Sequence, residues 1–303
     1  MAQGIRLAGV GGSGSDNLRG ALFMMGGMAA FTLGDAVSKA LLQMLPQFQA
    51  ITLRGLITIP LLLLLLHRSG LPDWSPVRAG WRLLGLRTMA EALSTVTFFA
   101  ALQAMPLGNL SAILQSAPLM ITLAAAIFLG EKVGWRRMLA IAVGFVGVLL
   151  IVRPDADGLS SPALLGLGTV LCVVVRDLVT RRMSTAIPAV MVALLTSLVV
   201  TLMSALLSMG QGWQPVPHAA WPLLLGGACC VIAGYIMMVR VMQIGEVGAI
   251  MPFRYTALIW ALLLGWLIWD EFPDAVTLTG AAIVIGSGAY TLLREARLAR
   301  GGK

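Results

Sequence analysis

The sequence predicts an all-α polytopic membrane protein, whose ten transmembrane helices form two inverted five-helix repeats around a central cavity. Composition is the first observation. Of the 303 residues, 58% are hydrophobic and 11% are charged, and the mean hydropathy is +0.91. Soluble domains carry about 25% charged residues. The second observation is a series of long apolar segments without the two-residue alternation of a membrane β-barrel.

Each apolar segment reaches roughly 20 residues with its flanks, which suits a hydrocarbon core about 30 Å thick. We expect spans at 18–41, 48–67, 82–103, 108–129, 135–152, 162–182, 189–209, 220–241, 247–269 and 275–293. The connections are too short for a soluble domain. The predicted organisation is a flexible cytoplasmic tail over 1–17, repeats over 18–152 and 160–293, and a basic cytoplasmic tail over 294–303.

A short phrase occurs twice and indicates the repeat. Residues 35–39 read DAVSK and residues 177–181 read DLVTR, so both follow the pattern acid, apolar, Val, hydroxyl, base. Pro46 and Pro188 follow the two copies at the same spacing. Because five spans is an odd number, the second copy must be inverted in the membrane, an arrangement on which many transporters are built.

The fourth and fifth spans of each half share further features. Pro118 and Pro252 interrupt the two fourth spans and are candidate hinges. The last spans are rich in glycine, with Gly144 and Gly147 in one and Gly280, Gly286 and Gly288 in the other. Small residues at such spacing predict close packing of these helices.

Basic residues near the span ends predict the orientation. With the N-terminus in the cytoplasm, most of them fall on the inner side and few beyond Arg153 on the outer side. This distribution follows the positive-inside rule and places both termini in the cytoplasm. The expected location is the bacterial-type inner (plasma) membrane.

Charged residues inside the spans are the strongest candidates for function, since each costs about 2.5–3.5 kcal/mol at mid-membrane unless it is paired or faces water. Asp35, Lys39 and Arg54 lie toward the outer side and form a candidate outer ion network. The candidates for a cavity or gate nearer the middle or inner side are Arg87, Glu91, Arg176, Asp177 and Arg254. Alternatively, such charges form ion pairs that hold helices in register, for example between residues four apart.

Polar and aromatic residues near these charges complete the candidate cavity. Ser94 and Phe98 share a helical face with Glu91. The other candidates, which flank the proline interruptions or lie on the eighth span, are Gln115, Ser116, Tyr235 and Tyr255. The alternative for the aromatic residues is helix packing.

The phrases at 35–39 and 177–181, together with the segment 252–256 (PFRYT) that leads to Asp270 and Glu271, resemble the drug/metabolite transporter superfamily in its ten-helix EamA-type branch. The chain is similar to the amino-acid exporters of the YddG type. This resemblance implies a cavity lined by spans one, three, four, six, eight and nine, with the fifth and tenth spans behind.

Enzyme functions find little support in the sequence. The two histidines, His67 and His218, are expected in loops on opposite sides of the membrane, so no His-containing metal cluster or Ser-His dyad forms. No phosphate loop of the GK[ST] type occurs. We therefore expect no enzyme activity, no ATP drive, no cofactor and no bound metal. The distribution of the +8 net charge is explained by orientation, so no nucleic-acid partner is expected.

The resemblance implies a secondary transporter that exports amino acids or related small metabolites by alternating access. Related proteins run in either direction, so an importer of nucleoside-like or cofactor-like metabolites is the alternative. A channel is a further alternative, but it would need a continuous polar pathway, and the outer halves of spans three and eight are too apolar for one. The partners are then a small-molecule substrate and the lipid bilayer, and ten helices are enough to enclose a cavity within a monomer.

Overall fold

A computed structural model describes residues 14–68, 74–129, 134–153, 159–183, 187–243 and 250–301 of the chain. Within these ranges the chain consists of helices and short connections, and no strand occurs in them. Residues 1–13 and 302–303 of the predicted tails lie outside the described residues.

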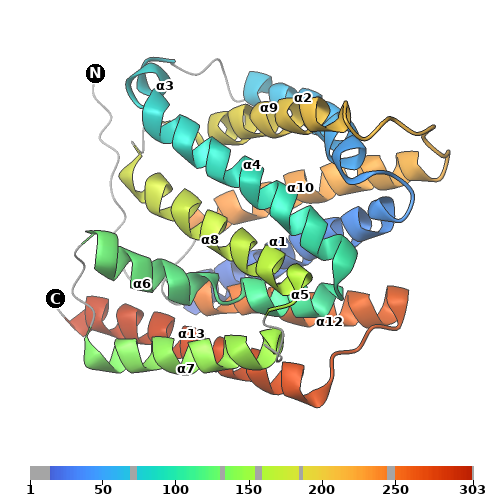
Figure 1. Cartoon of the computed structure of the whole chain (residues 1–303). Coiled ribbons are helices and arrows are strands. Elements are labelled where there is room, and N and C mark those ends of the chain that lie inside the picture. Colours follow the sequence, from blue (N-terminus) through green and yellow to red (C-terminus); the bar gives the residue numbers. More distant parts are fainter. Residues whose placement is uncertain are drawn as a thin grey trace.

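The helices of the first half are α1 (Gly14–Leu42), α2 (Gln47–Arg68), the short α3 (Ser75–Ala79), α4 (Trp81–Ala104), α5 (Leu107–Leu114), α6 (Ala117–Leu129) and α7 (Trp135–Val152). Those of the second half are α8 (Ser161–Arg182), α9 (Ala189–Ser208), α10 (Ala220–Gln243), the 3₁₀ helix η1 (Met251–Tyr255), α12 (Thr256–Trp269) and α13 (Ala275–Gly301). Figure 1 shows them as one bundle of roughly parallel and antiparallel rods.

Three boundaries differ from the prediction. Helix α1 begins at Gly14, inside the expected tail, and has Asp16 in its first turn, where a negative charge favours the helix dipole. Helix α13 continues to Gly301 through the expected basic tail, because Arg, Glu, Ala and Leu there are strong helix formers. His67 lies in the last turn of α2 rather than in a loop.

Nine segments in the described ranges are long and apolar enough to cross a bilayer. They match nine of the ten predicted spans. The tenth, α4, has 24 residues, about 36 Å of helix, but carries Arg82, Arg87 and Glu91 and is more polar than the others. Its packing explains this composition, because Arg87 and Glu91 lie on the face of α4 that contacts α8 and α9.

Both fourth spans are interrupted as predicted. In the first half, α5 ends at Leu114 and α6 begins at Ala117, with Pro118 in its first turn. In the second half, Pro252 lies in the 3₁₀ helix η1, which leads directly into α12. Proline lacks the N–H that would continue an α-helical ladder, so each span is split into two pieces.

The packing of the helices follows the inverted repeat. Helix α1 packs chiefly against α10, and its counterpart α8 packs against α4, the counterpart of α10. Three further pairs, α2 with α9, α5 with α12 and α7 with α13, each join two counterparts. A pseudo-two-fold axis requires this pattern. We call the end where α1 begins and α13 ends the termini end, and the end where α4 ends and α5 begins the far end.

The pair α7 and α13 lies at the edge of the bundle and depends on glycine. A Cβ on Gly147 would lie 2.7 Å from the carbonyl oxygen of Gly280, and a Cβ on Gly280 would lie 2.6 Å from that of Gly147. Each backbone therefore occupies the space of the other's missing side chain. The predicted close packing of the glycine-rich spans is confirmed at this contact.

We expect Gly147→Ala to destabilise the protein, because its methyl group would meet the backbone of Gly280 rather than a flexible side chain. Overpacking of this kind costs about 1–3 kcal/mol. Thermal unfolding of the detergent-solubilised protein measures the loss.

Gly168→Ala is the matched control, since Gly168 also lies inside a helix but a Cβ there would meet nothing within 4 Å. It should leave the melting temperature unchanged or raise it, because alanine favours helix. Equal effects of the two substitutions would contradict the glycine contact as the reason for the packing.

Candidate functional site

A cavity of about 340 Å³ lies inside the bundle, between α1, α2, α4, α8, α9 and α10, with Leu114 at the end of α5 also on its wall. Its wall carries the charged residues Asp35, Arg54 and Glu91. Hydroxyl groups and aromatic rings form much of the remainder, among them Thr58, Ser94, Thr95, Thr169, Thr196, Ser197, Thr201, Phe31, Phe98 and Phe99. A cavity of this size and mixed chemistry suits a small organic molecule.

The set of helices around the cavity differs in part from the expectation. Helices α2 and α9, the second and seventh spans, line it, whereas no described residue of η1 or α12 does. The reason is the close contact of α2 with α9, where Gly55 lies so near Thr201 that no Cβ fits between them. This contact closes one side of the cavity. The fifth and tenth spans, α7 and α13, stay outside it as expected.

Arg54 is held in place by two neighbours. Its Nη1 donates a hydrogen bond to Ser38 Oγ at 3.0 Å, and Ser38 in turn donates to the carbonyl of Gly34 at 2.7 Å. The guanidinium also lies 4.8 Å from the centroid of the Phe99 ring, within cation–π range. A guanidinium has five N–H donors, so an anionic group entering the cavity finds further donors already oriented.

Asp35 lies on the same cavity wall, and Arg54 is the charged neighbour that acts on it. Its carboxylate forms no ion pair within 4.0 Å and accepts no hydrogen bond from any described residue. The residue four positions later, Lys39, pairs elsewhere. The three expected members of an outer ion network thus separate, with Asp35 and Arg54 at the cavity and Lys39 at the far end.

A second group of charges borders the cavity toward the termini end. Arg176 Nη1 donates to Glu91 Oε2 at 2.9 Å, and its Nε donates to Asp177 Oδ1 at 2.7 Å. One turn from Glu91, Arg87 donates to Thr196 Oγ1 at 2.8 Å. We call these residues the termini-end network. Arg87 and Glu91 therefore bond to other helices rather than to each other, although they are four residues apart.

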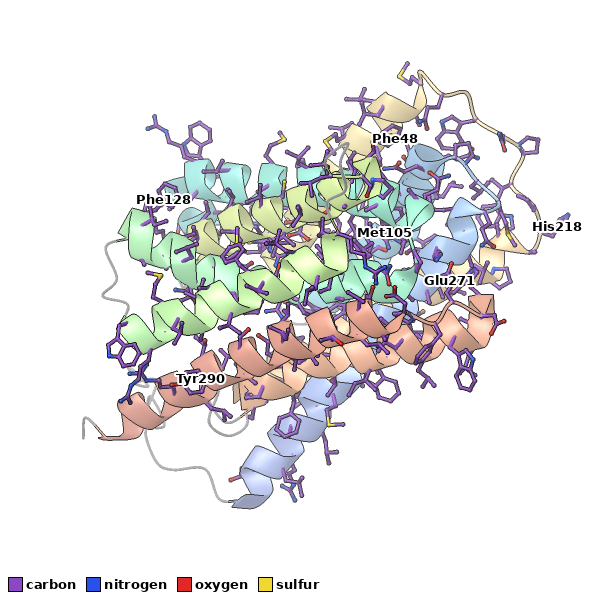
Figure 2. All side chains as sticks on the ribbon, turned by 60° about the horizontal axis from the view of Figure 1, so that its bottom comes forward. Phe48, Met105, Phe128, His218, Glu271 and Tyr290 are labelled. Atoms are coloured by element: carbon purple, nitrogen blue, oxygen red, sulfur yellow. The ribbon has the colours of Figure 1, made fainter. Side chains whose placement is uncertain are left out.

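The far end is joined by Lys39 and Glu271. Lys39 Nζ lies 2.7 and 2.5 Å from the two carboxylate oxygens and donates to the carbonyl of Met105 at 3.3 Å. Glu271 also accepts a hydrogen bond from the backbone N–H of Leu107 at 3.4 Å. Figure 2 shows Met105 and Glu271 near each other, with Phe128 and Tyr290 toward the opposite end. This far-end network connects α1, the α4–α5 junction and the segment after α12.

The remaining predicted site residues lie away from the described cavity wall. Gln115 and Ser116 are buried at the break between α5 and α6, where Ser116 donates to the carbonyl of Ile113. Tyr255 packs its hydroxyl against Gly288 of α13. The remaining two are Tyr235, whose buried hydroxyl has no hydrogen-bond partner among the described residues, and Arg254, which lies within electrostatic range of Asp177.

Sequence reasoning missed the hydroxyl groups of α9 and the partner of Lys39. Thr196, Ser197 and Thr201 line the cavity. Together with the buried Ser204 and Ser208, they form a row of hydroxyl groups along an otherwise apolar helix. That spacing of three to five residues is a readable signal. In the described residues, no group of three His, Cys, Asp or Glu side chains is placed to hold a metal ion.

Nine apolar segments long enough to cross a bilayer among the described residues, together with α4 and a polar internal cavity, define a polytopic membrane protein of the transporter class. The chain belongs to the EamA-like transporter family, whose model matches it twice, at residues 18–153 and 160–293. A solved crystal structure 20% identical in sequence has the same fold, with a TM-score of 0.60 over 94% of this chain and 98% of its own.

The curated relatives are transporters of different substrates. The chain is 26% identical to a riboflavin transporter of Vibrio cholerae serotype O1, over 93% of this chain and 96% of the relative. It is 26% identical to the pseudopaline exporter CntI of Pseudomonas aeruginosa, over 85% and 91%. An S-adenosylmethionine uptake transporter of Rickettsia conorii is 26% identical over 59% and 61%. None of these three names is that of an amino-acid exporter.

We expect Lys39→Met to lower the free energy of unfolding by about 1–3 kcal/mol, because it leaves the Glu271 carboxylate and the Met105 carbonyl without their donor. The side chain of Lys39 is 8% exposed and that of Glu271 is 28% exposed, so water replaces the lost bonds only in part. Thermal unfolding in detergent measures the change.

Arg153→Met is the control, since Arg153 forms an ion pair with Asp274 at the same end, with both side chains about half exposed. The hydrogen bond from Arg153 holds the pKa of Asp274 below its usual range. Exposed pairs contribute little to stability, so Arg153→Met should leave the melting temperature almost unchanged. A shift as large as that of Lys39→Met would argue against a special role for the buried pair.

Proposed function

We propose that the chain is a secondary carrier of the inner membrane that moves small organic molecules by alternating access, with the central cavity as its substrate site. One observation carries this proposal: Arg54 and Asp35 lie on the same wall of a cavity inside a membrane-spanning bundle. The guanidinium of Arg54 is held in place by a hydrogen bond, and the carboxylate of Asp35 forms no ion pair with a described residue. Charges at such a depth are costly and are kept where they serve a pathway.

The cavity chemistry favours a zwitterionic substrate. Arg54 can bind a carboxylate, and Asp35 or Glu91 can bind an ammonium group. The rings of Phe98 and Phe99, whose centroids are 5.9 Å apart, offer an apolar surface to the rest of the molecule. An amino acid has these three parts, and outward movement of amino acids or related metabolites is the proposed physiological direction.

Import of a cofactor-like metabolite is the second candidate. Relatives named as riboflavin and S-adenosylmethionine transporters favour it, together with the aromatic lining of the cavity. S-adenosylmethionine itself carries an amino-acid group, so the two candidates share the charge pattern and differ in the size of the attached group.

The two ionic networks provide a basis for alternating access. The termini-end network borders one side of the cavity, and the far-end network lies one helical turn beyond Asp35 on the other. We propose that the repeats at 18–152 and 160–293 rock about Pro118 and Pro252, so that one network opens while the other closes. Both termini are then cytoplasmic, and one chain suffices as the transport unit.

We expect saturable exchange of neutral or aromatic amino acids by the protein in proteoliposomes. Counterflow with labelled amino acids, with and without a pH gradient, is the measurement. Asp35→Asn should raise the half-saturation concentration about tenfold or more, because a hydrogen bond to a charged group contributes about 1.5–3 kcal/mol.

Asp270→Asn is the matched control. Asp270 lies at the far end, away from the cavity, in a left-handed backbone conformation (φ 56°) that asparagine also tolerates. It should transport like the unmodified protein. No exchange across the panel would reject the amino-acid assignment, and the same assay with flavins and S-adenosylmethionine would then test the second candidate.

A further inference from the structure

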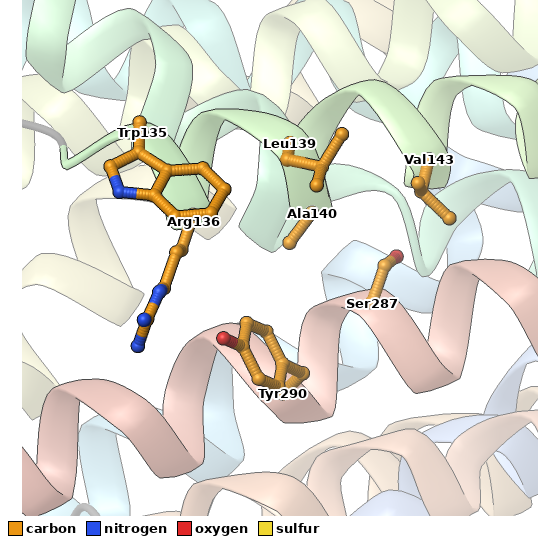
Figure 3. A pocket seen from close by; sticks show the side chains of 7 residues that line it. All are labelled: Trp135, Arg136, Leu139, Ala140, Val143, Ser287 and Tyr290. Carbon is orange, nitrogen blue, oxygen red and sulfur yellow. The ribbon is translucent and has the colours of Figure 1, made fainter.

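An open groove of about 410 Å³ runs along the outside of the bundle between α7 and α13, near the termini end (Figure 3). It shares no lining residue with the central cavity. Leu139 and Val143 of α7 and Tyr290 of α13 form its walls, and the buried Ala140 and Ser287 form its floor. The groove is therefore separate from the proposed substrate site.

The spacing of α7 and α13 explains the groove. The two backbones touch at Gly147 and Gly280, and they are still close at Gly144, where a Cβ would lie 2.7 Å from Ser287 Oγ. One turn nearer the termini end, Ala140 is too small to fill the space between the helices. The glycine contact thus leaves an unfilled groove beyond it.

Hydrocarbon is the natural content of this groove. The outward face of α7 presents Leu139, Val143, Val146 and Leu149, each between 45% and 56% exposed. On a membrane-spanning helix such a face meets lipid chains. Water gains few hydrogen bonds in an apolar space, so an acyl chain is the better occupant.

The termini end of the groove is positively charged and aromatic. The guanidinium of Arg136 lies 5.3 Å from the centroid of the Trp135 ring and extends on the side of Tyr290. Arg294 follows one turn after Tyr290 on α13. Among the described residues, none that lines the groove is acidic. Trp and Tyr concentrate at the depth of lipid headgroups, where Arg136 would meet a phosphate.

We propose that this groove is a binding site for an anionic phospholipid. One acyl chain lies along Leu139 and Val143, and the phosphate group of the same lipid accepts hydrogen bonds from Arg136. Because α7 belongs to the first repeat and α13 to the second, a lipid bound between them contacts both repeats at the back of the bundle.

Helix α4 provides an internal comparison. It begins with Trp81 and Arg82, whose guanidinium lies 5.5 Å from the ring centroid, so the same aromatic and basic pair occurs at the start of another helix. Neither residue lines the groove. A general attraction of basic residues to anionic lipid would act at both pairs, whereas a groove site acts only at Arg136.

Native mass spectrometry of the full chain, mixed with equal amounts of phosphatidylglycerol and phosphatidylcholine, tests the proposal. The unmodified protein should retain phosphatidylglycerol over phosphatidylcholine about fivefold, the effect expected of one arginine near an anionic lipid. Arg136→Ala should lose this preference and Arg82→Ala should keep it. Excess inorganic phosphate should not displace the lipid, because the acyl chain contributes to binding.

Filling the groove gives a second test that leaves the charges intact. Val143→Trp places a large side chain in the groove and should reduce retention of the lipid about fivefold or more. Val146→Trp, one turn away at a similarly exposed position outside the groove, should not. Circular dichroism and size-exclusion chromatography confirm that each variant is folded.

Three results would overturn the proposal. The first is equal retention of the two lipids by the unmodified protein. The second is an equal loss of phosphatidylglycerol in Arg136→Ala and Arg82→Ala, which would indicate general surface attraction. The third is unchanged retention in folded Val143→Trp. None of these readouts depends on the transported substrate, so they leave the proposed carrier function unaffected.

Discussion

The cost of a charge inside a bilayer is the constraint on which this fold depends. Arg54, Arg87, Glu91 and Arg176 all lie well inside their helices, and each lines the cavity or bonds to another helix, while Asp177 pairs with Arg176 on its own helix. Helix α4, which carries two of them, turns its charged face toward α8 and α9 and leaves Leu86, Met89 and Leu93 exposed on the other side. The apolar pair α7 and α13 has no such constraint and lies at the back, where glycine contacts hold it together.

The same constraint explains why the charged residues of the cavity differ in their partners. Arg54 is fixed by Ser38 and Phe99, whereas Asp35, on the same wall, has no ion-pair partner among the described residues. A carboxylate in that position is stabilised by water or by a cationic ligand group. The substrate would therefore replace water at a site that is already polar, which reduces the desolvation penalty of carrying a charged molecule through the membrane.

Patterns within a few residues were sufficient to predict the helices, but they did not predict which side chains pair with one another. The repeated phrase at 35–39 and 177–181 and the two prolines predicted the inverted halves and their interrupted spans. Spacing of four residues suggested pairing of Arg87 with Glu91, yet Glu91 pairs with Arg176, 85 positions away. Lys39 pairs with Glu271, 232 positions away. Such contacts depend on how helices cross. The serine and threonine residues of α9 were not predicted as part of the site. Their hydroxyl groups can form hydrogen bonds within their own helix, and they lower the hydropathy of the segment only slightly.

The pairing of counterpart helices has a consequence for how the transporter can evolve. A pair of counterpart helices, such as α7 with α13, is mapped onto itself by the pseudo-two-fold axis, so under the proposed alternating access the pair is common to the inward-facing and outward-facing forms. The pairs α1–α10 and α4–α8 are instead exchanged by the axis, so a substitution in one of them favours one form over the other. Sequence divergence in those off-axis pairs is where a duplicated ancestor acquires a preferred resting orientation.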